Sequence, residues 1–409
     1  MDDFVDHFFR QKSVEVTAVL AKRFGAMHLD TIEQGIQEAF LKALQIWPLK
    51  GVPEKPFAWI LVVARNYTID ELRREKVFLE KAESYYDKQT VVMEENLDAF
   101  QDEYIRLLYL CCHPSLKEGE KLAVTLKYAC GFGVQQISQA LFAKAEAIRK
   151  QIYRAKKKMQ QQRIDFFIDF TEPETEERSD SVLRSLYLLY NEGYKASEGE
   201  GLLRYELCSE AERVLRILAR SVIPHKEKIY ALMALVLLQS ARLPARIAED
   251  GSLIVLKYQE RSKWDFKKIQ EGMHYLELSM QAKQQSVYHL QAAIAACHSI
   301  AAKYTDTNWQ NILKLYDSLL QLDNSPLVHL NRSIAYAEIF GAEAALGLVD
   351  KIALEPQMQQ YHLLPAWRGE LFRRLGENGK AIEQYQQALS LAQTIPEQQF
   401  LRNCLRKLA

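Results

Sequence analysis

The chain has 409 residues, which is the length of two or three domains, and its 48% hydrophobic and 26% charged residues are ordinary for a soluble globular protein. It contains no apolar run of 18 residues, and its acidic N-terminal stretch lacks the apolar core of a signal peptide, so we expect neither a membrane span nor secretion. Six cysteines without framework spacing favour a reducing, cytoplasmic location.

The net charge of zero hides a strong asymmetry along the chain. Residues 77–103 carry 2 basic and 8 acidic groups, whereas residues 104–163 carry 12 basic and 3 acidic groups. A basic block of this kind in a neutral chain indicates a module that binds a polyanion.

The first clear element is an amphipathic helix over "LDTIEQGIQEAFLKALQIW", residues 29–47, whose apolar residues recur at helical spacing. Asp30 or Thr31 is expected to cap its start, and Pro48 is expected to stop it.

The next helix, "FAWILVVARNYTIDELRREK" at residues 57–76, joins an apolar run to a basic end. At 100° per residue, one face carries Trp59, Asn66, Asp70 and Arg73, while the opposite face carries Leu61, Ile69 and Leu72 and should be buried. The first face suits single-stranded or opening nucleic acid, because the ring stacks on a base while arginine holds phosphate. The structural alternative is a core tryptophan beside an Asp70–Arg73 or Asp70–Arg74 pair.

Residues 77–103 form an acidic, weakly periodic linker, and the basic block follows it. In that block Val134, Ile137 and Leu141 line a short helix, and "FAKA" is a turn. In the next helix an apolar stripe should pack inward, made of Ile148, Ile152, Ala155 and Met159. The outward residues are then Glu146, Arg149, Lys150, Tyr153, Arg154, Lys156 and Lys157.

This pattern predicts a helix-turn-helix whose basic second helix enters a major groove. Residues 149–163 hold seven basic side chains and no acid, which favours DNA binding over the alternative of a merely solvated charged face.

After a polar junction at residues 164–180, residues 181–409 are expected to be helical. The stretch "GSLIVLKYQ" at 251–259 could form a short hairpin or a buried helical turn. Small and aromatic residues in "GELFRRLGENGKAIEQYQQAL", residues 369–389, fit a tetratricopeptide-type helical hairpin.

Two further motifs invite chemical interpretations. Cys111, Cys112 and His113 are adjacent and lack a second pair at zinc spacing, so we expect packed thiols instead of a metal or redox site. The stretch "LYNEGYKASEGEG" at 189–201 contains no nucleophile–base pair, which favours a structural loop, with a small-ligand pocket as the alternative. We expect no enzyme, no cofactor and no metal.

Several motifs together resemble a known family. "IQEAFLKAL", "FAWILVVARNYTIDELRRE" and the helix-turn-helix resemble regions 2 and 4 of extracytoplasmic-function (ECF) sigma factors, the bacterial subunits that give RNA polymerase its promoter specificity. Later motifs resemble the sigma-factor group with a long C-terminal tetratricopeptide-like (TPR-like) domain, so the resemblance reaches nearly the whole chain: "LCCHPSL", "LYNEGYKAS", "ALMALVLLQSARLPAR", "QERSKWD", "LNRSIAYAEIFGAEAAL" and "YHLLPAWRGELFRRLG".

The resemblance implies an all-α protein with a region 2 helical bundle at 1–76, a region 4 helix-turn-helix at 104–163 and a TPR-like regulatory domain at 181–409. It implies core RNA polymerase and promoter DNA as partners, with contacts to the β′ clamp coiled coil and the β flap, and a protein or small ligand for the C-terminal domain. Family members have no catalytic centre of their own.

The same resemblance assigns roles to residues. Contacts to the polymerase core would come from Gln37, Glu38 and Leu41. The −10 element would be recognised and opened by Lys50, Lys55, Trp59, Asn66, Asp70, Arg73 and Arg74. The −35 element would be read by Lys144, Glu146, Arg149, Lys150, Tyr153, Arg154, Lys156 and Lys157. Relatives usually carry several basic residues in the recognition turn, whereas "FAKAEA" has only Lys144.

A second hypothesis is a helix-turn-helix repressor or activator with a repeat-type sensor domain, acting without being a polymerase subunit. The helix at 57–76 discriminates the two, because a plain repressor has no need of it.

Overall fold

The computed structural model describes residues 2–74, 97–141, 143–162, 164, 174–194, 205–221, 223 and 225–408. Over these residues the fold is all-α, as predicted, and the one extended pairing is an isolated antiparallel bridge between Ile247 and Leu253. Among them, no helix combines the length and the apolar character needed to cross a membrane. Most of the predicted linker and junction, residues 77–96 and 165–173, lies outside the described residues.

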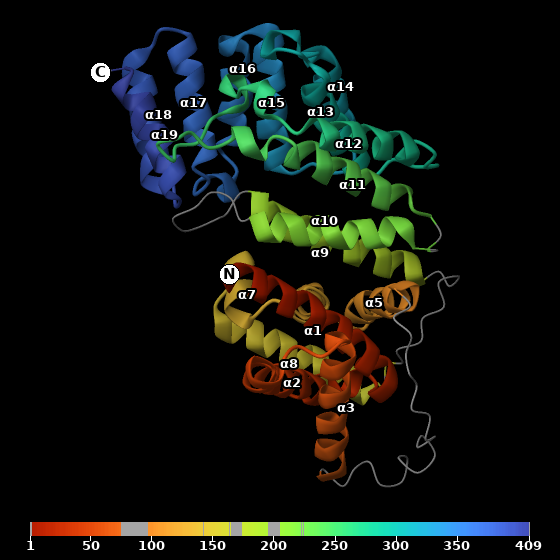
Figure 1. Cartoon of the computed structure of the whole chain (residues 1–409). Coiled ribbons are helices and arrows are strands. Elements are labelled where there is room, and N and C mark those ends of the chain that lie inside the picture. Colours follow the sequence, from red (N-terminus) through yellow and green to blue (C-terminus); the bar gives the residue numbers. More distant parts are fainter. Residues whose placement is uncertain are drawn as a thin grey trace. The chain divides into compact units, whose positions relative to one another are not determined.

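The chain divides into two compact units, Met1–Leu186 and Tyr187–Ala409, and the boundary falls inside one helix, α9. The first unit contains, in chain order, α1 (Asp2–Phe24), η1 (Ala26–His28), α2 (Leu29–Lys50), α3 (Pro56–Arg74), α5 (Leu97–Cys111), α6 (Glu118–Val124), the π-helical turn η2 (Thr125–Ala129), α7 (Val134–Ala140), α8 (Ala145–Gln161) and the first part of α9 (Glu174–Tyr194) (Figure 1).

A close approach of α2 and α3 organises the first half of this unit. A side chain at Gly35 would meet the backbone oxygen of Ala64 at 2.7 Å, so only glycine lets the helices come this near. The Thr68 hydroxyl donates to the Ala64 carbonyl at 2.8 Å and leaves the contact without an unpaired polar group.

Two predictions about α2 were wrong. α2 runs through Pro48 and ends at Lys50, because a proline removes only one backbone donor, and Gly51, whose φ is 82°, is its C-cap. Its N-cap is His28, and no side chain caps it.

The buried face of α3 also differs from the predicted one. It consists of Ile60, Ala64, Thr68 and Leu72. Of the predicted face, Leu72 is buried as expected, whereas Leu61 and Ile69 are only half-buried, because the residues next to Gly35 of α2 are Ala64 and Thr68.

The second unit is a succession of antiparallel helices (Figure 1). After the end of α9 come α10 (Tyr205–Arg220), α11 (Glu227–Ser240), α12 (Phe266–Ser279), α13 (Val287–Ile300), α14 (Trp309–Leu320), α15 (Pro326–Phe340), α16 (Ala342–Ile352), α17 (Leu363–Arg374), α18 (Asn378–Leu391) and α19 (Ile395–Arg406). Short 3-10 turns lie between them: η3 (Leu243–Ala245), η4 (Leu256–Tyr258), η5 (Arg261–Lys263), η6 (Tyr304–Asp306) and η7 (Pro356–Met358).

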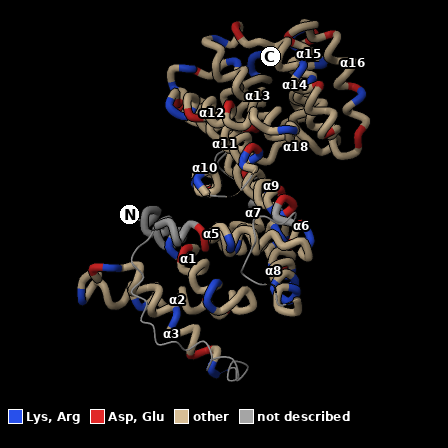
Figure 2. Tube along the Cα trace, turned by 90° about the vertical axis from the view of Figure 1, so that its right-hand side faces the viewer, with Lys and Arg blue, Asp and Glu red and all other residues tan. Residues whose placement is uncertain are grey.

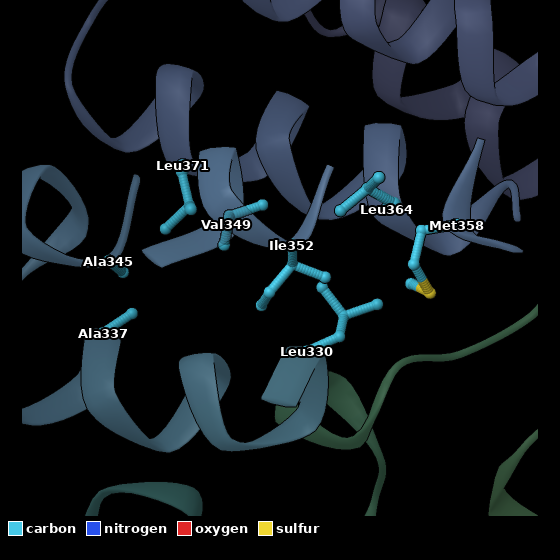
Figure 3. Packing of buried hydrophobic residues seen from close by; sticks show 8 residues of the cluster. All are labelled: Leu330, Ala337, Ala345, Val349, Ile352, Met358, Leu364 and Leu371. Carbon is cyan, nitrogen blue, oxygen red and sulfur yellow. The ribbon is translucent and has the colours of Figure 1, made fainter. Parts of the chain in front are cut away.

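Several apolar clusters, each built from consecutive helices, are buried in this unit. Figure 3 shows one of them, in which Leu330 of α15, Val349 and Ile352 of α16, and Leu364 and Leu371 of α17 converge. Such local cores let a long unit form from sequential hairpins.

The hairpin predicted at 369–389 is present as α17 and α18. A side chain at Gly369 would meet the Tyr385 ring at 3.0 Å, so the glycine makes room for a buried tyrosine. The stretch 251–259 contributes Leu253 to the isolated bridge and then forms the 3-10 turn η4, so it is neither a full hairpin nor a helix.

Candidate nucleic-acid interface

The helix-turn-helix consists of α7 and α8, and its apolar core matches the predicted stripe. Ile148, Ile152, Ala155 and Met159 of α8 are all buried, together with Ile137 of α7. This packing fixes which face of α8 is free, because residues between the buried positions must point away from the core.

The free face of α8 is basic. Tyr153 is 62% exposed. The other exposed side chains of the predicted interface are Lys144, Glu146, Arg149, Lys150, Arg154 and Lys157. Within the face, the Lys150 ammonium pairs with the Glu146 carboxylate at 2.8 Å. Figure 2 shows basic residues gathered along α8. The face thus presents several cationic side chains on one side of a helix, which is the kind of surface that attracts DNA phosphates.

Lys156 has a different environment. It is half-buried and forms an ion pair with Asp30 at the start of α2. Two contacts from η2 reach the same part of α2: Lys127 pairs with Glu33, and the Tyr128 hydroxyl lies 3.3 Å from Asp30. Sequence reasoning treated Asp30 as a helix cap and missed these contacts, because the partners lie about 100 residues apart and carry no shared pattern.

A buried carboxylate positions α8 on its neighbours. Glu120 of α6 accepts hydrogen bonds from the Lys158 ammonium at 2.7 Å and from the Lys117 backbone N–H at 2.9 Å. Burial alone would raise the pKa of Glu120, but these two donors outweigh it and lower the pKa, so the Glu120 carboxylate is charged at neutral pH. Lys158 is therefore committed to the fold and unavailable to a ligand.

The predicted −10 residues lie on α3, in the loop before it and at the end of α2. Trp59 is half-buried and packs edge-on against Trp47, with ring centroids 5.6 Å apart. Asn66 is exposed and accepts a hydrogen bond from Arg65 at 3.1 Å. The aromatic surface at this end of α3 is therefore shared by two tryptophans.

The charged end of α3 combines two exposed pairs. The Asp70 carboxylate lies 3.9 Å from Arg73, and Arg74 pairs with Glu71 at 2.6 Å. Lys50, the last residue of α2, and Lys55, in the loop before α3, are exposed.

The outer face of α2 exposes apolar surface. Leu41 is 54% exposed and Leu44 is 58% exposed. Gln37 is exposed beside them, and Glu38 pairs with Lys42 at 3.6 Å. An exposed apolar strip rimmed by polar groups is typical of a protein contact.

The cysteine motif has no exposed thiol. Cys111 and Cys112 are both buried, and burial raises the pKa of Cys112 to about 12 against the hydrogen bond from Thr125. No group of metal-ligating side chains occurs in the described ranges. The neutral, buried thiols act as packing groups.

Comparisons with known proteins assign the segment that contains the helix-turn-helix to a family model. Residues 106–159 match a family model described as "Sigma-70, region 4", so this segment is sigma-factor-like and DNA-binding in character. Residues 178–280 match a model described as a family of unknown function, DUF6596. The uncharacterized protein R00370 of Rhizobium meliloti (strain 1021) is 33% identical over 391 residues, which cover 93% of this chain and 91% of that protein.

Proposed function

The chain belongs to the same protein family as this Rhizobium meliloti protein, and we propose that it is an ECF-type sigma factor. It binds core RNA polymerase and directs the enzyme to specific promoters for transcription initiation. The observation that supports this most is the exposed basic face of α8, which lies within the segment that matches sigma-70 region 4.

In this proposal α8 reads the −35 element. Arg149 and Lys150 lie in its first two turns, where a recognition helix approaches base edges, while Arg154 and Lys157 further along contact phosphates. The lone basic residue of the preceding turn, Lys144, limits the number of contacts made before the helix begins.

The helices α2 and α3 supply the other two roles. Trp59, backed by Trp47, offers a ring to an unstacked base, and the exposed Arg73 lies on the same helix for phosphate. Leu41, with Gln37 and Glu38 beside it, forms the contact to the polymerase β′ clamp.

The C-terminal unit acts as a built-in TPR-like regulatory or stabilising domain, in the place of a separate inhibitor protein. Its helical hairpins with local cores are the support for this role. The whole chain then works in the cytoplasm, where the polymerase is.

The test is a pull-down of bacterial core RNA polymerase by the full chain, followed by transcription from a library of genomic fragments. We expect a stable complex and a defined set of new transcripts. Leu41→Ala should weaken the complex by about tenfold, since a central apolar contact contributes more than 1 kcal/mol. Leu49→Ala is the matched control, because Leu49 is 86% exposed on the same helix and has no proposed role.

If the chain alone binds duplex DNA in a gel-shift assay and does not bind the polymerase, it is a helix-turn-helix regulator of another kind. That outcome would refute the sigma-factor assignment.

A further inference from the structure

The proposed function leaves unused an arginine cluster in the C-terminal unit. Arg242, Arg246 and Arg261 all lie in the segment between α11 and α12. The backbone N–H of Asp265 donates to the carbonyl of Ala241 at 2.9 Å, which closes this segment into a loop. The closure brings three cationic side chains to one place.

Two aromatic rings hold the guanidinium groups. Arg242 donates to the Tyr194 hydroxyl at 2.6 Å, and the Arg246 guanidinium lies over the Tyr194 ring, 3.8 Å from its centroid. Arg261 lies 4.5 Å from the centroid of Trp264, and Arg242 lies 6.0 Å from the same ring. Tyr194 and Trp264 therefore join the three arginines into one cluster.

Within the part of the chain that the structure describes, none of these three arginines forms an ion pair with a carboxylate, and Asp306 acts on Arg261 only from beyond ion-pair distance. Arg261 donates instead to the backbone carbonyls of His298 at 2.6 Å and Ala301 at 2.5 Å. Six other arginines of the same unit each pair with Asp or Glu: Arg213, Arg216, Arg332, Arg368, Arg373 and Arg374. Among the described residues of this unit the cluster thus differs from these six paired arginines, and like charges at close range repel.

Hydrogen-bonding atoms in and around the cluster are also without partners. These buried atoms are Arg242 Nε, Arg261 Nη2, Trp264 Nε1 and His298 Nδ1. Trp264 is only 4% exposed, so water does not replace the missing partner freely. An acceptor group at this place would satisfy several donors at once.

The protonation states fit an excess of positive charge. Burial and then the nearby Arg242 and Arg261 lower the pKa of His298 to about 3, so the imidazole is neutral at pH 7. Burial would raise the pKa of the Tyr194 hydroxyl, but Arg242 and Arg246 outweigh it and lower the pKa. Both pKa values are lowered, and nearby arginines without a carboxylate partner act in that direction on both groups.

We propose that this cluster is a binding site for a small molecule that carries a phosphate or carboxylate group. Planar guanidinium groups bind such oxyanions through paired hydrogen bonds, and Arg242 and Arg261 each retain an unused donor. The anion replaces the missing carboxylate, and the aromatic rings of Tyr194 and Trp264 border it. The motif "LYNEGYKASEGEG" thus contributes a residue to a ligand site through Tyr194.

Isothermal titration calorimetry of the full chain with inorganic phosphate and with citrate, in chloride buffer of matched ionic strength, tests the proposal. We expect saturable binding of at least one anion, and the stronger of the two identifies the phosphate or carboxylate class. Arg242→Gln and Arg261→Gln should each weaken binding by roughly 10- to 100-fold, because each removes a charged hydrogen bond.

Arg332→Gln is the matched control, since Arg332 belongs to the same unit but already pairs with Asp317 at 2.6 Å. Arg242→Lys keeps the charge and loses the planar guanidinium, so it should bind the anion with an affinity between those of the wild type and Arg242→Gln. This variant provides the test if Arg242→Gln does not fold. The absence of saturable binding to the wild-type chain overturns the proposal. Equal loss of binding in Arg332→Gln overturns it too.

Discussion

Replacing two arginines of α8 tests whether its basic face meets DNA. Arg149 and Arg154 are both exposed, and neither takes part in the buried core of the helix-turn-helix, so Arg149→Ala with Arg154→Ala should leave the free energy of unfolding nearly unchanged. On a random duplex, where Arg149 finds no cognate base edge, we expect it to contact phosphate as Arg154 does. Each lost phosphate contact lowers the slope of log K against log salt by about 0.9, and two contacts by about 1.8. Between 50 and 200 mM salt, the wild-type affinity should therefore fall about 12-fold more than the affinity of the double variant.

Fluorescence anisotropy of the full chain on a labelled duplex measures this slope, and a random sequence suffices because the phosphate term is independent of sequence. The matched control is Arg402→Ala with Arg406→Ala, which removes the same charge from exposed positions on α19. Identical slopes for wild type and the α8 variant would refute the assignment of these arginines to DNA. A slope that changes equally in the control would show only an effect of net charge.

Three further predictions concern the first unit. Trp59→Ala should lower the free energy of unfolding by about 2 kcal/mol, roughly half the value for a fully buried tryptophan, because the ring is half-buried against Trp47. Urea unfolding measures this loss. Assays of abortive transcription and of open-complex formation should show a defect in promoter opening that the loss of stability does not explain. Gly35→Ala should destabilise the chain by about 1–3 kcal/mol, since the added methyl meets the Ala64 carbonyl oxygen at 2.7 Å, and thermal unfolding followed by circular dichroism measures the shift. Burial raises the pKa of Cys112 to about 12. The stability contributed by its protonated thiol is therefore fully present below pH 9 and is lost as the pH rises toward 12, by about 1.4 kcal/mol per pH unit. Urea titrations at pH 8, 9 and 10 measure this decline, and Cys112→Ala should make it less steep.

Control variants separate these specific effects from a general loss of stability. Gly347→Ala lies in α16 with no atom near the added methyl, so it should be neutral or slightly stabilising where Gly35→Ala is costly. Intact stability of Gly35→Ala would show that α2 and α3 pack less closely than described. If the smaller fraction of folded protein accounts for the whole promoter-opening defect of Trp59→Ala, then Trp59 is only a core residue and does not contact DNA.

The sequence by itself determined the all-α class and the helix-turn-helix. Those features follow from local spacing: Ile148, Ile152, Ala155 and Met159 define the inner face of α8, and the basic residues between them define the outer one. The hairpin of α17 and α18 was predictable for the same reason, since Gly369 and Tyr385 belong to adjacent helices of one short motif. The roles of individual interface residues stay predictions.

Only the tertiary structure decided which of these residues are free to act. Lys156 is indistinguishable from Lys157 in sequence, yet it pairs with Asp30 in another helix. The arginine cluster is likewise invisible along the chain, because Tyr194 joins it from the end of α9. Periodicity reports what a residue does within its own helix, whereas ion pairs and unpaired charges depend on distances between segments that no local pattern encodes.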